Sequence, residues 1–486
     1  MQPNIELLSQ ELVGRVLDEA FQLLQNPGVK VQAASARRIL AEAGAWVSQS
    51  SEIVQIPESL ARHALASVPR SFELYTRDGK EALHFGEDAV HFDPGSSGVH
   101  ILEAQTLAHR PSYTDDLVRI VKLTEVLPQY DAQSTAVVCN EVPKQIGDLY
   151  RLYLVLLFSN KPIISGAFST RTTQFMFDML SIFRSGREEL RRKPLAVFDV
   201  CPSPPLIWSD FAAQNLIDLA RAGVPAEIVS MPLAGAAAPV TLIGAVVQHA
   251  AECISGITIH QLAQAGAPVV WGGAPAIFDM RYGTTPMGAV ETAMIDVAYT
   301  QVGKSLGIPT HTYLGASDSK LVDAQAGLES GMSALIGALA GINMISGAGM
   351  LDFLACQSLE KLVIDAEIIG MVKRLLKGIE IHTETLATEL FEGVFFKGDF
   401  LKQHITRKLF PLEQYLPSDV IDRGSIRLWE ENGKTDAFHR AHLRVQELLG
   451  NYSRPPMDDH LQRELIAMVA EFAKEAGMDQ LPAIDL

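Results

Sequence analysis

Cysteines are few in this sequence, and none has the spacing of a metal-binding or redox pair. The 486 residues include four of them, Cys139, Cys201, Cys253 and Cys356, which are widely separated. There is no C-x-x-C pair, and no cysteine stands two residues after a histidine, so the pattern predicts neither a zinc-thiolate site nor a disulfide framework. A reducing, cytoplasmic setting is therefore expected.

An excess of positive charge and an unbroken membrane-length apolar run are also missing. The 57 acidic side chains outnumber the 40 basic ones, and the resulting net charge of -17 repels nucleic acid and anionic lipid. Two long uncharged runs, 231–247 and 331–351, contain proline or repeated glycine together with polar residues, which is not typical of a spanning helix. The first 25 residues lack a basic start followed by an apolar core, so no signal peptide is expected.

Several motifs of common enzyme classes are absent as well. The sequence contains no H-E-x-x-H, no G-x-S-x-G and no Walker loop, and its Gly-rich segments do not have the spacing of a dinucleotide fingerprint. Hydride transfer and phosphoryl transfer therefore lose support.

What is present is a series of short apolar segments, each followed by a helix-length stretch. The candidate strands lie at 134–138, 162–166, 195–200, 226–231, 268–271, 309–314, 343–346 and 394–396. Eight such units predict a (β/α)8 TIM barrel, which the spacing favours over a doubly wound sheet with similar local signals. We expect an N-terminal helical and β-hairpin region at 1–130, the barrel at 131–403 and a C-terminal helical extension at 404–486.

The active site of a barrel lies at the carboxyl ends of its strands, and aromatic residues stand there in this sequence. Phe168, Trp271 and Tyr313 could present ring faces to a quaternary cation, which has no proton to donate, or they could simply pack against the loops. Asp318 and Lys320 follow the sixth strand, where they could act as an acid–base pair or form a surface ion pair.

Four segments resemble the trimethylamine methyltransferase family, and they occur in the order 110–117, 317–329, 359–368 and 415–429. The resemblance extends over nearly the whole chain. Members of that family look like TIM barrels that bind a methylated amine in the barrel mouth and present it to the cobalt of a small corrinoid protein. The resemblance therefore implies a methyltransferase whose cofactor is a corrinoid (cobalamin), carried by a cognate partner protein or free.

Some members of the family carry pyrrolysine in the region of the sixth strand, whereas residues 312–323 are all ordinary amino acids here. This difference implies demethylation of a quaternary amine rather than of trimethylamine. Glycine betaine is the first choice, and proline betaine, carnitine and γ-butyrobetaine follow. The leaving group would be a neutral tertiary amine, so the reaction needs no general acid.

The strand ends and the resemblance together predict the site. Asp318 and Lys320 are the candidate catalytic residues, and the candidate substrate-binding residues are Phe168, Trp271, Gly272, Gly273, Arg281, His311, Tyr313, Ser317 and Gly347. Arg281, His311, Lys320 or the backbone amides of the glycines could take the carboxylate of a betaine.

Two alternatives stay open at this point: a quaternary-amine sensor without catalysis, and another barrel enzyme such as a lyase that uses Asp318 and Lys320. The apolar content indicates contacts between subunits, so a homo-oligomer is expected, but it fixes no symmetry.

Overall fold

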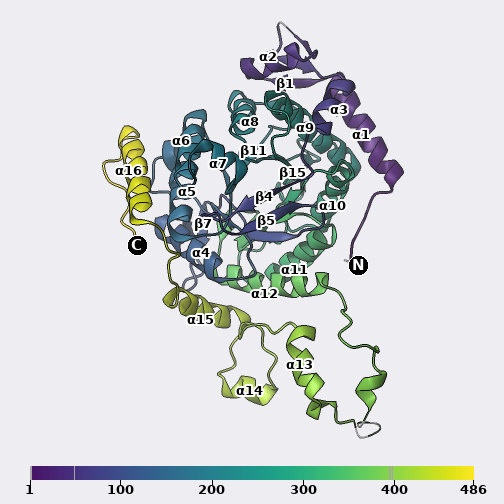
Figure 1. Cartoon of the computed structure of the whole chain (residues 1–486), viewed down its shortest axis with the longest axis vertical. Helices are drawn as coiled ribbons and strands as arrows, with labels where there is room; N and C mark the ends of the chain where they lie inside the picture. The colour runs from purple at the N-terminus through teal and green to yellow at the C-terminus, as the bar shows by residue number, and fades with distance from the viewer. Residues whose placement is uncertain (1–2, 49, 393, 395, 397, 486) are drawn as a thin grey trace.

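Parallel strands surrounded by helices form the main body of the computed structural model, which describes residues 3–48, 50–392, 394, 396 and 398–485 (Figure 1). One sheet has the strand order β15-β13-β11-β10-β9, and a second has the order β17-β18-β6. All pairings within these two sheets are parallel. The strands are β6 (His91–Pro94), β9 (Gln133–Ser134), β10 (Ile163–Gly166), β11 (Ala196–Val200), β13 (Ala226–Ser230), β15 (Val269–Gly273), β17 (His311–Thr312) and β18 (Met344–Ala348).

Hydrogen bonds connect the two sheets at both of their edges. On one side, the backbone N–H of Trp271 donates to the carbonyl of Pro309 over 2.8 Å. On the other side, the N–H of Asp131 donates to the carbonyl of Phe92, also over 2.8 Å. The carboxyl ends of all eight strands therefore lie on one side of the body, where the site of a parallel α/β protein is expected.

The first seven predicted strands each overlap a strand of the structure, although their bounds differ, whereas the eighth does not. The expected strand at 394–396 includes Phe395, which lies outside the described residues, and its neighbours Val394 and Phe396 are not in a strand. The place beside β18 is taken by β6, which comes from the N-terminal part of the chain. In sequence this four-residue strand resembles a turn, because it contains an aspartate, ends in a proline and is followed by a glycine. Its pairing on both sides stabilises it as a strand.

Helices cover the outside of the strands. They are α5 (Gly147–Phe158), α6 (Thr170–Ser181), α7 (Arg187–Arg192), α8 (Asp210–Ala222), α9 (Leu242–Ala263), α10 (Val290–Ser305), α11 (Ala324–Leu339) and α12 (Leu359–Leu376). Only α9, among the described helices, is long and apolar enough to cross a membrane, but 83% of its most apolar window is buried. It packs against α1, α3, α8 and α10, so it is a core helix of the body.

The N-terminal part contributes helices and a β-hairpin. Its helices are α1 (Gln10–Gln25), α2 (Ala34–Glu42), α3 (Glu58–Ala66) and α4 (Thr114–Val126), and a small sheet joins β1 (Val29–Val31), β2 (Trp46–Val47) and β3 (Ile53–Gln55) to β12 (Ile207–Trp208). The hairpin consists of β4 (Ser71–Tyr75) and β5 (Ala82–Gly86). Its Leu74 and Phe85 pack against Val197 and Val270 of the parallel strands.

Short strands also lie in the loops. Leu233–Ala234 (β14) pairs with Ala276–Ile277 (β16), and a four-stranded sheet joins β19 (Met350–Leu351), β20 (Cys356–Gln357), β7 (His100–Leu102) and β8 (His109–Pro111).

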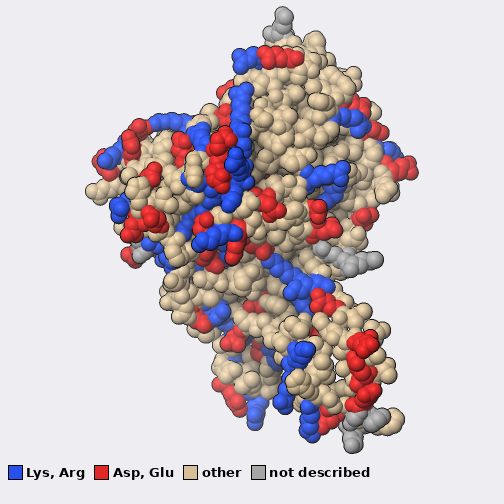
Figure 2. All heavy atoms as spheres, in the orientation of Figure 1, with Lys and Arg blue, Asp and Glu red and all other residues tan. Residues whose placement is uncertain are grey.

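The C-terminal part is helical, with α13 (His404–Glu413), α14 (Ile426–Glu431), α15 (Ala437–Gly450) and α16 (Asp459–Glu475). Helix α15 packs on α12 and α4, and α16 packs on α5. The chain between α12 and α15 extends away from the body as an arm (Figure 1). Acidic and basic side chains lie next to each other on the visible face of both parts (Figure 2). The arm exposes large apolar side chains, including Ile379, Leu386, Leu401 and Ile426.

Candidate functional site

The strands carry an apolar layer and, toward their carboxyl ends, a polar layer. The apolar layer is formed by Ala132, Ile164, Val197, Val270 and Met344 together with the hairpin residues Leu74 and Phe85. Asp199 follows Val197 by two residues and Ser346 follows Met344 by two, so both share the face of the apolar layer. Register pairs Asp199 with Glu227 on β13, and Ser346 with Asp93 on β6.

Direct contacts link the polar side chains. Nε2 of His311 lies 2.8 Å from Oγ of Ser346, and this hydroxyl donates to the carboxyl of Asp93. Nδ1 of His311 lies against the carboxyl of Glu227, although the contact does not have the angles of a hydrogen bond. We call Asp93, Asp199, Glu227, His311 and Ser346 the interior cluster.

Four carboxyl oxygens of the interior cluster have no hydrogen-bond donor among the described residues. They are Oδ2 of Asp93, Oδ1 of Asp199 and both oxygens of Glu227. Leaving a buried polar atom without a partner costs about 1–3 kcal/mol. So many orphaned oxygens in one place indicate a site that a ligand completes.

Burial sets the protonation of the interior cluster. It raises the pKa of Asp199 to about 8, with Glu227 as a further cause, and it holds the pKa values of Asp93 and Glu227 well above their usual range. It also lowers the pKa of His311 to about 4. Both shifts favour the neutral forms of His311 and Glu227 in their contact.

The site opens toward the carboxyl ends of the strands. Asp199 is partly exposed, and Cys201, directly after the end of β11, is exposed. The OH of Tyr313 donates to Oδ2 of Asp199 and lies 3.0 Å from Oγ of Ser96. The ring of Tyr313 stands edge-on to that of His311, with 5.0 Å between the centroids.

A strained turn covers part of this opening. Asp352, Phe353 and Leu354, between β19 and β20, all have left-handed backbones, with φ of 50°, 57° and 67°. Such a conformation costs an L-residue about 1–2 kcal/mol, and runs of it are rare. The turn packs Leu354 against the group that contains Tyr313 and Met287, so the strain is placed at the rim of the site.

The structure brings only some of the predicted residues to the interior cluster. His311 belongs to the interior cluster and Tyr313 contacts it. Gly272 faces the cluster, since a Cβ at this position would lie 2.7 Å from Oε1 of Glu227. Phe168 stands exposed at the rim. Trp271 and Gly273 point the other way because side chains alternate along a strand, and Trp271 packs on Gly303 of α10. The tryptophan expected to face the cation is thus part of the outer packing.

The other predicted residues lie in the surrounding loops. Both oxygens of Asp318 accept backbone N–H groups, from Met287 over 2.8 Å and from Gly288 over 3.0 Å, and burial raises its pKa to about 6. Lys320 is exposed and lies 3.4 Å from Asp352.

Ser317, Arg281 and Gly347 have local partners as well. Ser317 donates to Glu329, and Arg281 is an exposed partner of Asp279. Gly347 packs against the carbonyl of Leu314.

The carboxyl groups of the interior cluster lie within the strands, so a prediction based on the residues that follow each strand did not include them. A signal was present, because Asp199 and Glu227 stand in V-F-D-V and A-E-I-V, where a charged residue interrupts a buried strand. Asp93 was missed together with its strand.

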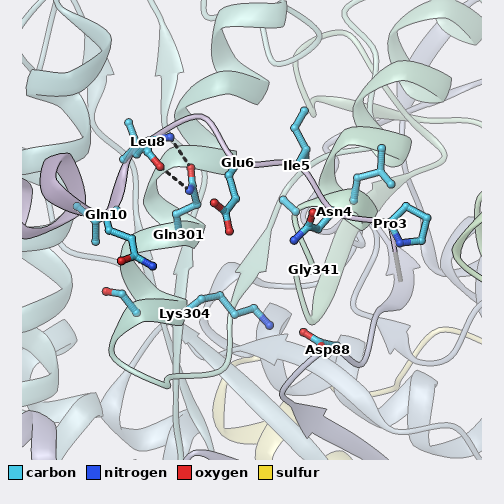
Figure 3. A pocket seen from close by; sticks show the side chains of 14 residues that line it. Pro3, Asn4, Ile5, Glu6, Leu8, Gln10, Asp88, Gln301, Lys304 and Gly341 are labelled. Atoms are coloured by element: carbon cyan, nitrogen blue, oxygen red, sulfur yellow. Dashed lines mark hydrogen bonds between the residues drawn. The ribbon is translucent and has the colours of Figure 1, made fainter. Parts of the chain in front are cut away.

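A cavity of about 830 Å³ lies elsewhere (Figure 3). Its walls include Lys304 and Gly341, which precede β17 and β18, and the N-terminal segment around Leu8, which is bonded to Gln301. It therefore opens at the amino ends of the strands, away from the interior cluster. In the part of the chain that the structure describes, no group of three or more His, Cys, Asp or Glu side chains is arranged to hold a metal ion.

Comparison with known proteins identifies the family. The sequence model described as "Trimethylamine methyltransferase (MTTB)" matches residues 1–477. The chain belongs to the trimethylamine methyltransferase family. The resemblance in the sequence is confirmed, and the protein is an enzyme of the methyltransferase class.

Two relatives of the chain carry the names of different activities. The chain is 32% identical to a trimethylamine methyltransferase of Methanosarcina thermophila, covering 96% of this chain and 97% of the relative. It is 28% identical to a glycine betaine methyltransferase of Desulfitobacterium hafniense strain Y51, covering 98% of each. The solved monomethylamine methyltransferase of Methanosarcina barkeri matches with a TM-score of 0.54 at 13% identity, covering 92% of this chain and 89% of that one. This last likeness concerns the fold alone.

Proposed function

We propose that the protein moves a methyl group from a small quaternary amine to the cobalt(I) of a corrinoid carried by a partner protein, with glycine betaine as the first substrate to test. The observation that carries the proposal is the set of orphaned carboxyl oxygens of Asp93, Asp199 and Glu227 in the interior cluster. The orphaned oxygens can face the positively charged methyl groups of a quaternary cation, and the ring of Tyr313 can contact the same methyl groups. Proline betaine, carnitine and γ-butyrobetaine carry the same cation and come next.

The protonation of the interior cluster suits methyl transfer. Positive charge disappears from the nitrogen as the methyl group leaves, so fully ionised carboxylates would stabilise the bound substrate more than the transition state. The raised pKa values of Asp93 and Glu227 favour their neutral forms, which limits that effect. The amine product is neutral and needs no proton from the protein to depart. The chain's own residues bind the substrate, orient it and exclude water.

The rim offers a surface for the partner. Large apolar side chains are exposed on the loops that follow β10, β13 and β15, namely Phe168, Met231, Met280 and Tyr282. A flat apolar face of a macrocycle can rest on such side chains. The corrinoid, when bound there, supplies the nucleophile that takes the methyl group.

In this proposal Asp318 and Lys320 position loops rather than take part in the chemistry. Asp318 fixes the loop at 286–288 through two backbone N–H groups, and Lys320 lies on the strained turn through Asp352. They would act as positioning residues, and a lyase that uses them as its catalytic pair loses support because neither touches the interior cluster.

Several wider features belong to the same proposal. The eight parallel strands would close into one (β/α)8 barrel, whose main part lies between domain limits near 130 and 403 and whose strand β6 comes from the N-terminal region. The exposed apolar arm between α12 and α15 would be covered in a homo-oligomer, and the enzyme would work in the cytoplasm.

The test is a methylation assay with a cobalt(I) corrinoid and one candidate amine at a time. We expect the cobalt(I) absorption band to disappear with glycine betaine or a related betaine, and trimethylamine to give no conversion. Binding without conversion for every amine tried would contradict the enzyme assignment and favour a sensor.

A further inference from the structure

One buried guanidinium lies at the rim of the site and was not among the predicted residues. Arg151, on α5, is 1% exposed. Its Nη1 donates to the carbonyl of Thr135 over 3.0 Å and to Oγ of Ser97 over 3.2 Å, and its Nε donates to the carbonyl of Gly147 over 3.3 Å. These bonds account for three of its five N–H groups, while the two on Nη2 have no acceptor among the described residues.

Arg151 also lacks a carboxylate partner within ion-pair distance in the described part of the chain. The neighbouring Asp148 is already occupied, since it accepts bonds from the N–H of Phe168, the N–H of Leu149 and the hydroxyl of Thr172. By contrast, Arg110 holds both oxygens of Asp116 over 2.7 and 2.8 Å. A buried cation without a counter-ion is costly, so Arg151 lies ready for an anionic ligand.

Short contacts connect Arg151 to the interior cluster. Ser97 bonds Arg151, its neighbour Ser96 contacts Tyr313, and Tyr313 bonds Asp199. Ser97 has a left-handed backbone with φ of 63°, which marks a constrained loop at this position. The ring of Phe168 lies 5.1 Å from Cζ of Arg151 and holds the guanidinium from one side.

We propose that Arg151 is the anion subsite of this enzyme and binds the carboxylate of a zwitterionic quaternary amine. This inference rests on the proposed function. The interior cluster then faces the methylated nitrogen while Arg151 holds the acid group, so one site accommodates both charges of a betaine. Arg281 and Lys320, the cations suggested by the sequence, are exposed and bound to acidic neighbours. The enzyme is therefore selective for amino-acid betaines over cations that have no carboxylate.

The test is calorimetric binding to the purified full chain without any methyl acceptor. Glycine betaine, choline and tetramethylammonium are titrated into the wild type, R151Q and R151K. We expect R151Q to weaken glycine betaine binding about ten- to hundredfold, as the loss of a charge-assisted hydrogen bond does, and to leave tetramethylammonium within about twofold. R151K keeps the charge without the planar fork and should fall in between.

Two further variants control for folding and for nonspecific charge. R171Q removes an exposed arginine that also lies over an aromatic ring, that of Phe472, and should change none of the three affinities. S97A removes one support of Arg151 and should weaken glycine betaine severalfold even where R151Q fails to fold.

The outcomes separate the two proposals. Equal affinities of the wild type for glycine betaine and tetramethylammonium, or an unchanged preference in R151Q and S97A, would overturn the anion subsite. In a parallel cobalt(I) assay, no conversion with any quaternary amine would instead overturn the proposed function, while a carboxylate preference in binding would still support Arg151.

Discussion

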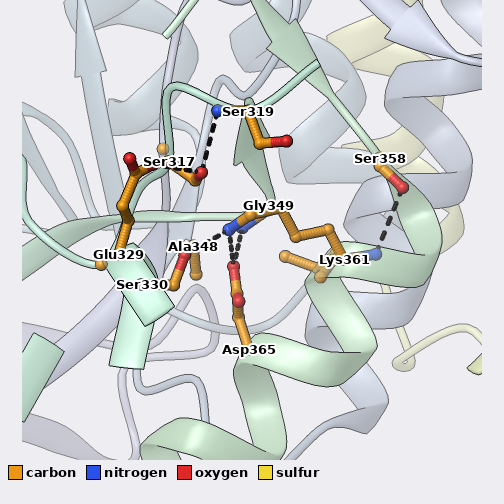
Figure 4. A network of polar contacts seen from close by, with 12 residues as sticks. Ser317, Ser319, Glu329, Ser330, Ala348, Gly349, Ser358, Lys361 and Asp365 are labelled. Carbon is orange, nitrogen blue, oxygen red and sulfur yellow. Dashed lines mark hydrogen bonds and ion pairs between the residues drawn. The ribbon is translucent and has the colours of Figure 1, made fainter. Parts of the chain in front are cut away.

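Two buried groups of carboxyl side chains in this protein differ in how they are compensated. Behind β18, Asp365 on α12 accepts bonds from Nζ of Lys361 over 2.6 Å and from the N–H of Gly349 over 2.7 Å, and Ser358 caps the same helix (Figure 4). In the interior cluster, Glu227 is equally buried, yet neither of its oxygens has a bonded donor among the described residues. A carboxylate that is fully compensated holds the fold together, whereas one left open is arranged for a ligand.

The largest effect should come from breaking the compensated group. K361M leaves Asp365 buried without its cation, and we expect a loss of about 3–5 kcal/mol in the free energy of unfolding. Chemical denaturation measures this loss. The double variant K361M/D365L should recover most of it, and a single variant as stable as the wild type would contradict the structural role of the pair.

The matching change in the open group should lower activity and leave stability nearly unchanged. E227Q removes an acid that has no bonded partner, so we expect stability to change by less than about 1 kcal/mol. Methyl transfer should fall by about tenfold or more because one of the orphaned oxygens that face the substrate's cation becomes an N–H donor. Denaturation curves and initial rates are compared on one preparation, and a large loss of stability at full activity would reverse the assignment.

A smaller loss of stability than that of K361M is expected where Gly272 makes room for the cluster. G272A would place a Cβ 2.7 Å from Oε1 of Glu227, which must shift. Overpacking of this kind costs about 1–3 kcal/mol. G327A, on α11 with open space around its Cβ position, is the control and should not lower the temperature of thermal unfolding, because alanine is the better helix former.

The smallest effect concerns pH. Burial raises the pKa of Asp199 to about 8, above that of the unfolded chain, so its contribution to stability is complete below about pH 4 and is lost as pH rises toward 8. Ionisation of Asp199 favours a cation, so glycine betaine affinity should increase between pH 6 and 9 with proton release on binding. Calorimetry in two buffers of different ionisation enthalpy measures this release. D199N should show neither trend, and an identical pH profile in D199N would exclude Asp199 as the titrating group.

The sequence predicted the seven strands that have apolar runs, because a buried parallel strand needs such a run. It did not predict β6, whose Asp93 and Pro94 are tolerated only through partners far away in the chain. Nor did it show the direction of side chains at strand ends. Trp271 and Gly272 are adjacent, and because side chains alternate along a strand, a shift of one residue decides which of them faces the cluster. The role of Arg151 was hidden because its helix is apolar on every side and the contacts that define it come from two distant loops.

The origin of β6 has a consequence for synthesis on the ribosome. Asp93 and Ser346 touch each other although 253 residues separate them, so the amino-terminal side of this contact is translated long before its partner exists. Until β18 emerges, one edge of β6 stays unpaired, and the interior cluster lacks Ser346. Closing so long a loop is entropically slow, so assembly of the site should be among the last steps of folding. A nascent chain halted before residue 344 would carry most of the helices and still be unable to bind an amine.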